Sequence, residues 1–317
     1  MIKVFINGFG RIGRCAARII LEDDRFELVG INDIYNIKQM KQLYDNDSIY
    51  GKATSTLEFV KLFSQQTPPK IECDVLLQCS GIHLTKDANL PYLKNGAKKI
   101  IISAPASNEI PTYIYGVNHQ NYQDENIISN SSCSANAIVP IFKIIQKNFG
   151  IKSAFLSMYH SYTAYQKLLD VKHYSKDIRR ARSATQNIIP LESSAAKATS
   201  KFFPHLVDKL YAKSIRVPVD ATTFYDLSIN LENITSNNQV LKVLKKEILS
   251  SNILDLTDTP LVSRDFIQNS YSATIDLHST KLIEGNLLRV CAWQDNEYGY
   301  AKRLVDMANI VTKDSTF

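Results

Sequence analysis

The sequence predicts an α/β protein made of a Rossmann dinucleotide-binding domain and an α+β catalytic domain with a mostly antiparallel sheet. Three observations predict this arrangement. A glycine-rich turn at residues 8–13 joins a strand-like segment to a helix-like one. As far as Asn130, short apolar segments alternate with helical ones, which suits a parallel sheet. Beyond Cys133, several segments alternate apolar and polar residues, which favours an antiparallel sheet with one covered face.

The first domain is predicted to alternate strands with helices. Residues 2–6 form an apolar strand before the turn, and apolar positions three and four apart predict a helix directly after it. Thr85 is the expected N-cap of a second helix, and Gly96 lies just past its end. Further strands are expected at residues 26–33, 74–80, 98–103 and 126–130.

The second domain is predicted to begin with a helix from Ala135 to Phe149, which Gly150 ends. Residues 165–187 are expected to form a long ordered loop, and loops of that length usually carry function. Helical spacing returns at residues 239–249 and 300–311. Strands are expected at residues 154–163, 215–219, 223–231, 271–277 and 286–293. The predicted domains are residues 1–132, 133–299 and a C-terminal helix within 300–317.

Composition narrows the class of protein. A chain of 317 residues with 44% hydrophobic residues can bury a core in each of two domains. The net charge of +6 is spread without a basic run, so nucleic acid is an unexpected partner and small anionic substrates are compatible. No segment reaches eighteen consecutive apolar residues and no leader is recognisable, so we expect a soluble, cytoplasmic protein without a membrane partner. Five cysteines without a CxxC spacing predict free thiols and no metal site.

The turn has the features of a dinucleotide-binding fingerprint. The turn follows a strand and precedes a helix, and its glycines are Gly8, Gly10 and Gly13. An acidic residue, Asp33, lies at the end of the next strand, as this fingerprint requires. The glycines let the backbone approach a pyrophosphate at the positive end of the helix dipole. The Asp33 carboxylate would accept hydrogen bonds from the ribose hydroxyls. The alternative is an ordinary glycine-rich turn beside a surface aspartate. A carboxylate repels a 2′-phosphate, so NAD is predicted over NADP, although Lys172 could supply a cation for NADP.

Cys133 and His160 are the candidate catalytic pair. Cys133 follows a strand at the start of a predicted helix, where a thiol gains nucleophilicity through a lowered pKa. His160 lies near the end of another apolar run. Taken singly, a cysteine is more often a small buried hydrophobe and a histidine a structural residue. Their joint setting favours nucleophilic catalysis.

The chain resembles the phosphorylating glyceraldehyde-3-phosphate dehydrogenases and their relatives the erythrose-4-phosphate dehydrogenases. The matching segments are INGFGRIGR at 6–14, IND at 31–33, IISAP at 101–105, YGVNH at 115–119, SNSSC at 129–133, HSYT at 160–163, DIRRAR at 177–182, NIIP at 187–190, IRVP at 215–218 and DNEYGY at 295–300. The resemblance implies a C-terminal helix that packs back on the first domain, a homotetramer and a role in glycolysis.

The resemblance also implies site residues. Cys133 would be the nucleophile, and His160 the base that activates it. Thr163 and Arg216 would hold the phosphate of the substrate. Inorganic phosphate would bind Ser134, Arg180 and Ser193, with Ser132 also in the phosphate set. The cofactor residues would be Gly8, Gly10, Arg11, Ile12, Gly13, Asp33, Ser103 and Asn296.

The implied reaction begins when Cys133 attacks the aldehyde of D-glyceraldehyde 3-phosphate and forms a thiohemiacetal. Oxidation by NAD leaves an acyl thioester, which inorganic phosphate releases as an acyl phosphate. One alternative is an erythrose-4-phosphate dehydrogenase, in which water releases the acid. A second is a catalytically weak paralogue with a binding role. For Arg179, Arg180 and Arg182, the alternative is a solvated or interface cluster.

Several positions depart from the family pattern around the second anion site. Tyr165 stands where the family has Asp, and Ser193 and Ser194 replace a Thr-Gly pair. We expect Glu192 to be buried near this site and to oppose phosphate, so phosphate release is predicted to be weakened. Gln294 replaces the tyrosine one residue before the DNE motif, and residues 52–74 are shorter than their equivalent in the family.

Overall fold

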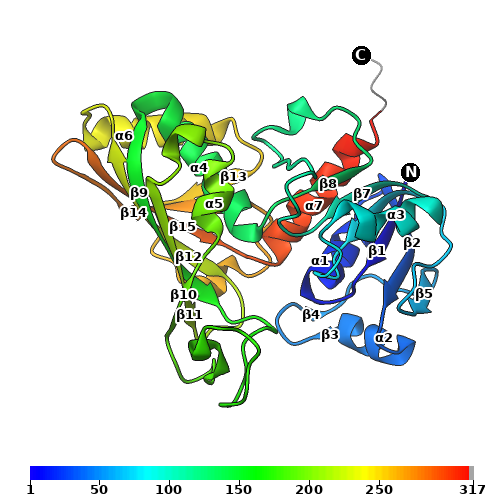
Figure 1. Cartoon of the computed structure of the whole chain (residues 1–317). Coiled ribbons are helices and arrows are strands. Elements are labelled where there is room, and N and C mark those ends of the chain that lie inside the picture. Colours follow the sequence, from blue (N-terminus) through cyan, green and yellow to red (C-terminus); the bar gives the residue numbers. More distant parts are fainter. Residues whose placement is uncertain (314–317) are drawn as a thin grey trace. The chain divides into compact units, whose positions relative to one another are not determined.

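The computed structural model describes residues 1–313, which form two compact units. Unit 1 comprises residues 1–136 together with the chain from Tyr300 onward, and unit 2 comprises residues 137–299. Both divisions fall inside helices, α4 (Cys133–Phe149) and α7 (Tyr298–Val311) (Figure 1). The expected domain boundary at Cys133 stays a prediction. The final residues of the expected C-terminal helix, 314–317, lie outside the described part.

Unit 1 is a Rossmann-like domain, as predicted. Its six-stranded sheet has the order β5-β2-β1-β6-β7-β8, and every neighbouring pair is parallel. The strands are β1 (Ile2–Asn7), β2 (Phe26–Asp33), β5 (Lys61–Ser64), β6 (Cys73–Gln78), β7 (Ala97–Ile102) and β8 (Ile127–Ser129). The other elements are α1 (Arg11–Leu21), α2 (Ile37–Asp45), the hairpin β3 (Asn46–Asp47) and β4 (Gly51–Lys52), α3 (Lys86–Lys94) and the 3-10 turn η1 (His119–Asn121). Thr85 caps α3 as expected, because its side chain accepts from the Ala88 amide.

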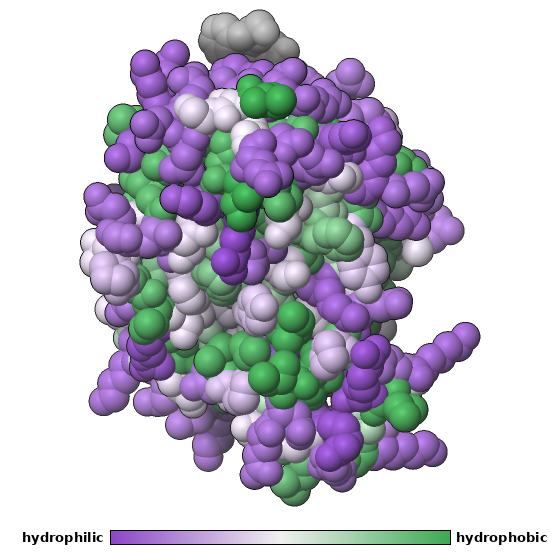
Figure 2. Space-filling view, turned by 90° about the vertical axis from the view of Figure 1, so that its left-hand side faces the viewer, coloured by the Kyte–Doolittle hydropathy of each residue, from purple (hydrophilic) through white to green (hydrophobic). Residues whose placement is uncertain are grey.

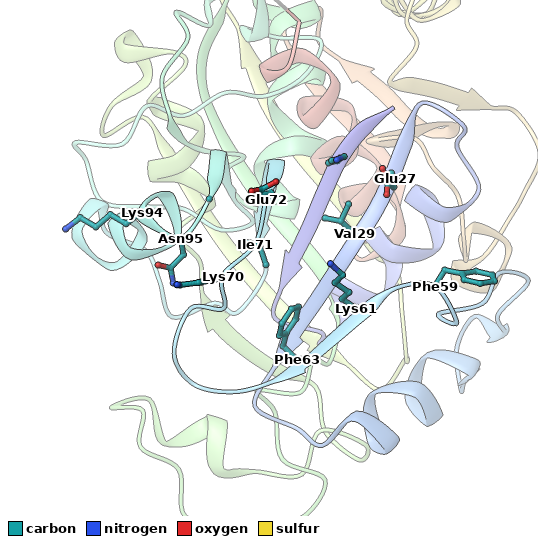
Figure 3. Close-up of a pocket in the computed structure, with 12 residues that line it drawn as sticks. Glu27, Val29, Phe59, Lys61, Phe63, Lys70, Ile71, Glu72, Lys94 and Asn95 are labelled. Atoms are coloured by element: carbon teal, nitrogen blue, oxygen red, sulfur yellow. The ribbon is translucent and has the colours of Figure 1, made fainter.

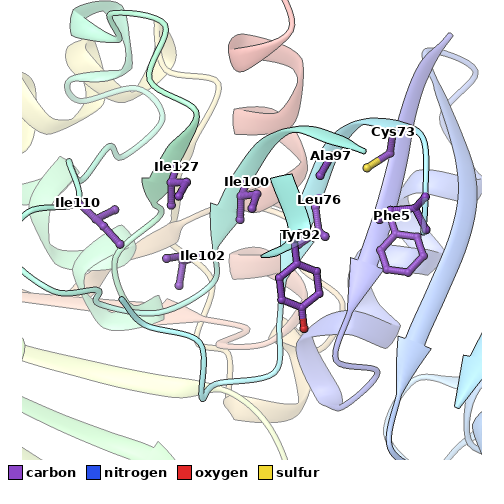
Figure 4. Packing of buried hydrophobic residues seen from close by; sticks show 10 residues of the cluster. Phe5, Cys73, Leu76, Tyr92, Ala97, Ile100, Ile102, Ile110 and Ile127 are labelled. Carbon is purple, nitrogen blue, oxygen red and sulfur yellow. The ribbon is translucent and has the colours of Figure 1, made fainter. Parts of the chain in front are cut away.

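One core cluster of unit 1 lies between the sheet and α3. Apolar side chains of β1, β6, β7 and β8 form one buried cluster with Tyr92 of α3 (Figure 4). Strands buried on both faces need continuous apolar runs, and the segment at 100–102 supplies three isoleucines in a row. The cluster keeps the carboxyl ends of these strands in register, and the glycine-rich turn follows one of those ends.

Unit 2 is built on a seven-stranded mixed sheet with the order β10-β11-β9-β12-β15-β14-β13. Its strands are β9 (Ile151–Ser161), β10 (Ile189–Glu192), β11 (Leu210–Val217), β12 (Thr223–Leu231), β13 (Leu254–Thr257), β14 (Ala273–Ile283) and β15 (Leu287–Gln294). Its further helical elements are η2 (Ile178–Ala181), α5 (Ala195–Ser200), η3 (Pro204–Leu206), α6 (Asn237–Leu249) and η4 (Ser263–Phe266). Four of the six pairings are antiparallel, which confirms the predicted mostly antiparallel sheet. The pairs β11–β9 and β14–β13 are parallel.

The two faces of this sheet differ in burial. Along β9, Leu156, Met158 and His160 are buried, whereas the alternating Phe155 and Tyr159 are exposed. Side chains of a strand point alternately to its two faces, so the face that carries His160 is the covered one. In Figure 2, apolar and weakly polar residues gather within a rim of hydrophilic ones.

Among residues 1–313, no helix is both long and apolar enough to cross a membrane.

Candidate active site

Two glycines of the turn are required by close packing. Gly8 has φ +97°, and a Cβ there would lie 2.4 Å from the Ser80 nitrogen. A Cβ on Gly13 would lie 2.1 Å from the Gly8 carbonyl oxygen. Around Gly10, in contrast, nothing lies within 4 Å of the position of a Cβ. The turn is therefore tightly folded and leaves open space before the first turn of α1.

The dinucleotide predicted from the sequence fits this turn. Gly10 has no side chain to cap the first amides of α1, and open space lies beside it. Such amides and the helix dipole favour a pyrophosphate. Asp33 accepts from the Phe9 amide at 2.5 Å and from the Ile34 amide at 2.6 Å, which fixes its carboxylate beside the turn. The Arg11 side chain donates to Asp47 at 2.5 Å, so phosphate would meet the backbone of Arg11 and Ile12.

A buried network of polar side chains lies at the ends of the strands next to the turn. The sequence analysis did not predict it. Asn7 donates to Gln78 Oε1 at 2.6 Å and to the Tyr92 hydroxyl at 2.9 Å, and Asn32 donates to Asn7 Oδ1 at 2.8 Å. These asparagines and Gln78 lie at the carboxyl ends of β1, β2 and β6. An amide residue at the last or next-to-last position of each of three apolar strands was the available signal. Ser103, an expected cofactor residue, lies at the same sheet edge, where its amide donates to the Gln78 carbonyl oxygen at 3.1 Å.

A separate hollow lies elsewhere in unit 1. It has a volume of about 670 Å³ and is lined by Lys3 and Glu27 near the starts of β1 and β2, by Lys61 and Phe63 of β5, and by Lys94 at the end of α3 (Figure 3). The turn and Asp33 follow the opposite ends of β1 and β2. The hollow is therefore not the dinucleotide site.

Cys133 is the first residue of α4 and is partly exposed. Ser132 accepts from the Ala135 amide at 3.1 Å and so caps the helix; its assignment to phosphate stays a prediction. The Ser134 hydroxyl lies 4.0 Å from the Cys133 sulfur. By contrast, burial raises the pKa of the Cys73 and Cys291 thiols to about 12, which leaves them unreactive.

His160 and Arg216 meet in unit 2 because of strand register. The two residues are aligned partners on the parallel strands β9 and β11, so their side chains share a face of the sheet. His160 is 4% exposed, and its Nδ1 lies 2.7 Å from Arg216 Nη1 and 2.7 Å from the Ser161 carbonyl oxygen. Burial, with the Arg216 charge as a second cause, lowers the His160 pKa to about 3.

Other predicted residues gather near this pair. The Thr163 amide and hydroxyl both donate to Gln166 Oε1, at 2.9 and 3.0 Å. Asn296 accepts from the Ser161 hydroxyl at 3.1 Å, so it belongs to the same cluster in unit 2. Its expected role in cofactor binding stays a prediction.

Two buried threonines at this cluster were missed by the sequence analysis. Thr223 is the aligned partner of His160 on β12, and Thr222 precedes it with φ +77°. Within the described chain, neither hydroxyl has a hydrogen-bond partner. Positive φ at a β-branched residue is strained, and such strain collects at functional sites. Local sequence carried no signal for it.

The loop that was predicted to be functional centres on an aromatic cluster. Arg180 lies over the Tyr165 ring at 5.2 Å, and this ring also contacts His173 and Tyr174. The neighbouring Arg179 and Arg182 form ion pairs with Asp177 and Asp170. Of the three arginines, Arg180 alone has no ion pair among the described residues.

The expected burial of Glu192 is wrong. Ile189 and Leu191 of β10 are buried, and alternation along the strand turns Glu192 outward, where it is exposed. Ser193 accepts from the Ala195 amide at 3.2 Å, so its hydroxyl stays near the start of α5. Gln294, the other departure from the family pattern, is buried and accepts from the Tyr225 hydroxyl at 2.7 Å. In residues 1–313, no group of three or more His, Cys, Asp or Glu side chains could hold a metal.

Comparison with known proteins follows the same division of the chain. Residues 2–86 match the family model of the glyceraldehyde 3-phosphate dehydrogenase NAD binding domain, and residues 132–296 match that of the C-terminal domain. The glyceraldehyde-3-phosphate dehydrogenase of Priestia megaterium is 36% identical over 330 residues, covering 98% of each chain. That of Zymomonas mobilis is 37% identical over 335 residues, covering 98% of this chain and 99% of its own. Glyceraldehyde-3-phosphate dehydrogenase 2 of Bacillus subtilis is 36% identical over 326 residues, covering 96% and 95%.

Proposed function

Since the chain belongs to the glyceraldehyde-3-phosphate dehydrogenase family, we propose that it oxidises D-glyceraldehyde 3-phosphate and releases the product to inorganic phosphate as an acyl phosphate. It is an NAD-dependent dehydrogenase, and NAD is its cofactor. The observation that carries the proposal is a partly exposed thiol, Cys133, at a helix N-terminus. The aligned pair of His160 and Arg216 supports it from unit 2.

In the proposed first step, Cys133 attacks the aldehyde carbon. His160 takes the thiol proton and returns it to the carbonyl oxygen, which leaves a thiohemiacetal. His160 then takes the hydroxyl proton as the carbon is oxidised. The turn of residues 8–13 would hold NAD, whose chemistry in this step would be to accept the hydride from that carbon. The product of this stage is an acyl thioester on Cys133.

The second stage needs a bound phosphate. An oxygen of inorganic phosphate attacks the thioester carbon, the carbon–sulfur bond breaks, and Cys133 leaves as the thiolate. Ser134, Arg180 and Ser193 would hold this phosphate, whereas Thr163 and Arg216 would hold the phosphate of the substrate. Guanidinium groups and hydroxyls suit phosphate oxygens. The outward position of Glu192 removes one reason to expect weak phosphate binding.

We also propose a homotetramer. The uncovered face of the unit 2 sheet exposes Phe155, Tyr159 and Tyr211, whose side chains are 65%, 39% and 48% exposed. Aromatic residues are enriched where subunits meet, and an apolar patch within a polar rim is typical of an interface. A second copy of the chain is the proposed occupant, and sedimentation would measure the assembly. We propose that the enzyme acts in glycolysis. We place it in the cytoplasm, a reducing compartment in which the thiol of Cys133 stays reduced.

The deciding experiment measures NADH formation from D-glyceraldehyde 3-phosphate and from erythrose 4-phosphate across a titration of inorganic phosphate. We expect a saturable phosphate requirement and a higher kcat/KM for D-glyceraldehyde 3-phosphate. A phosphate-independent rate that is higher with erythrose 4-phosphate would instead support hydrolysis of the thioester. We keep that alternative because Tyr165, which lies beneath Arg180, replaces a carboxylate of the family pattern and so changes the lining of the second anion site. Absence of turnover with both aldehydes would indicate a paralogue with a binding role.

A further inference from the structure

The hollow of unit 1 lies beside a connection that forms no helix. Parallel strands are usually joined by helical crossovers, which cover the faces of the sheet. The connection from β5 to β6, residues 65–72, contains neither a helix nor a strand, although β2 and β1 lie between the two strands that it joins. In Figure 3 it curves from Phe63 round to Ile71. A hollow of about 670 Å³ remains there.

The floor of the hollow is one face of β1, β2 and β5. Lys3 is the aligned partner of Glu27 on β2, and aligned residues of parallel strands share a face. Lys61 and Phe63 are two residues apart on β5, so they also share a face. The Phe63 ring lies 5.9 Å from the Phe5 ring, which anchors this floor to the core of unit 1.

Apolar side chains line the inner part of the hollow. Val29 and Phe63 are partly buried and pack against the core cluster of Figure 4, and Ile71 is buried. Phe59 lies at the edge and is 89% exposed. Sites for small molecules have volumes of about 300–1,000 Å³ and are lined by apolar and aromatic side chains with a few polar groups. The size and the apolar lining of this hollow therefore suit a small molecule with a ring.

The rim of the hollow has an excess of positive charge. Its charged residues are four lysines and two glutamates: Lys3, Lys61, Lys70, Lys94, Glu27 and Glu72. Within residues 1–313, none of these lysines forms an ion pair or donates a side-chain hydrogen bond. By contrast, Lys98 and Lys99 on β7 form ion pairs with Asp74 and Asp124. Unpaired ammonium groups around an apolar floor favour a ligand with an anionic group.

We propose that the hollow is a binding site for a small aromatic anion. The ring of the ligand lies against Val29 and Phe63, where apolar area is removed from water, and its anionic group meets Lys61 and Lys70. Glu27 lies near the start of β2, whereas Asp33 and the glycine-rich turn lie at the opposite ends of the strands. The aromatic anion and NAD should therefore bind at the same time. The inference does not depend on the proposed catalytic reaction.

The site is a feature of one variable segment of the chain. Half of the residues that line it lie within residues 52–74, the segment that we expect to be shorter than its equivalent in the family. Relatives that keep a longer segment should lack the site.

The first test compares two fluorescent probes that share their rings. 8-Anilinonaphthalene-1-sulfonate carries a sulfonate, and N-phenyl-1-naphthylamine has the same rings without the charge. Each is titrated into the full chain with saturating NAD, which keeps it out of the dinucleotide turn. We expect the sulfonate to have the lower Kd. The double variant Lys61→Gln, Lys70→Gln should raise the Kd of the sulfonate about fivefold, as expected for two exposed ion pairs, and should leave that of the uncharged probe unchanged.

The matched control removes two lysines from unit 2. The double variant Lys242→Gln, Lys245→Gln takes the same charge from the exposed side of α6 and should change neither Kd. An unchanged Kd of the sulfonate in the variant of the hollow would overturn the inference. An equal rise in both double variants would also overturn it, because it would show a general effect of charge. All four lysines are exposed, and circular dichroism checks that both variants fold.

The second test locates the bound sulfonate by lysine acetylation, read by mass spectrometry. Acetylation of Lys61 and Lys70 should slow in proportion to the bound fraction of the protein, whereas Lys242 should keep its rate. The sulfonate should also displace the uncharged probe, because both occupy the same apolar floor. Protection of other lysines with none at Lys61 and Lys70, or simultaneous binding of the two probes without competition, would refute the site.

Discussion

The two units contain candidate anion sites of different kinds. In unit 1, the candidate phosphate site is a backbone turn of residues 8–13, whose geometry is imposed by Gly8 and Gly13. In unit 2, the candidate site consists of side chains such as Arg216, which reaches its position through an alignment of strands 56 residues apart. A backbone site cannot move far. A side-chain site can, and only that kind of site can be coupled to a base such as His160.

The largest expected effect separates chemistry from cofactor binding. Cys133→Ser should lower turnover by about a thousandfold or more, because a hydroxyl is a far weaker nucleophile than a thiolate at neutral pH. NAD binding should change little, since the turn in unit 1 is a separate structure. NADH formation and an NAD titration measure the two effects. Turnover within tenfold of the parent would remove Cys133 from the mechanism.

A pair of glycine variants should separate the folding of unit 1 from its anion site. Gly8→Ala should lower the free energy of unfolding by about 2 kcal/mol or more, because its φ is positive and a Cβ meets the backbone of Ser80. Gly10→Ala should preserve the free energy of unfolding, since its Cβ enters open space. It should weaken the binding of NAD, because the added Cβ lies where the phosphate would approach. Denaturant unfolding and NAD titrations compare them. Equal stability of the two variants would contradict this division of roles.

Asp33→Asn tests the side-chain part of the cofactor site. Loss of the carboxylate should reduce the preference for NAD over NADP by about tenfold, because a repulsive charge and a strong acceptor are both removed. The ratio of kcat/KM for the two cofactors measures this preference. A parent that already prefers NADP would show that Lys172 outweighs Asp33.

The smallest expected effect concerns the loop of unit 2. Tyr165→Leu removes the ring beneath Arg180, and a cation–π contact of about 0.5–1 kcal/mol corresponds to roughly a two- to fivefold change. We therefore expect the KM for inorganic phosphate to rise by that factor while the KM for the aldehyde stays constant. Phosphate titration at saturating aldehyde measures it. A fall in the phosphate KM would show that the ring obstructs the site.

Local patterns were enough to predict unit 1. The turn, Asp33 and the cap at Thr85 all follow from residues close together in sequence. Short elements such as β5, which has four residues, carry too little pattern to be recognised. The outward orientation of Glu192 could have been predicted from the sequence, because it follows from the alternation of Ile189 and Leu191 along the strand.

Unit 2 shows where sequence reasoning ends. The antiparallel strands were predicted from alternation, but the parallel alignment of β9 with β11 depends on pairing between distant segments. The contact between His160 and Arg216 follows from that alignment, so the sequence could name both residues without showing that they touch. The buried hydroxyls of Thr222 and Thr223 were missed for the same reason.

The division of the chain inside α7 also affects the order in which the protein can be made. The core of unit 1 includes Leu304 and Val305, which are fully buried, and the Tyr300 hydroxyl donates to the Ser131 carbonyl oxygen. The ribosome reaches these residues only after it has synthesised all of unit 2. During synthesis, the strands of unit 1 therefore expose the apolar surface that these residues later cover. Exposed apolar surface of this kind can aggregate or bind a chaperone. Unit 2, a continuous segment, can complete its own core first.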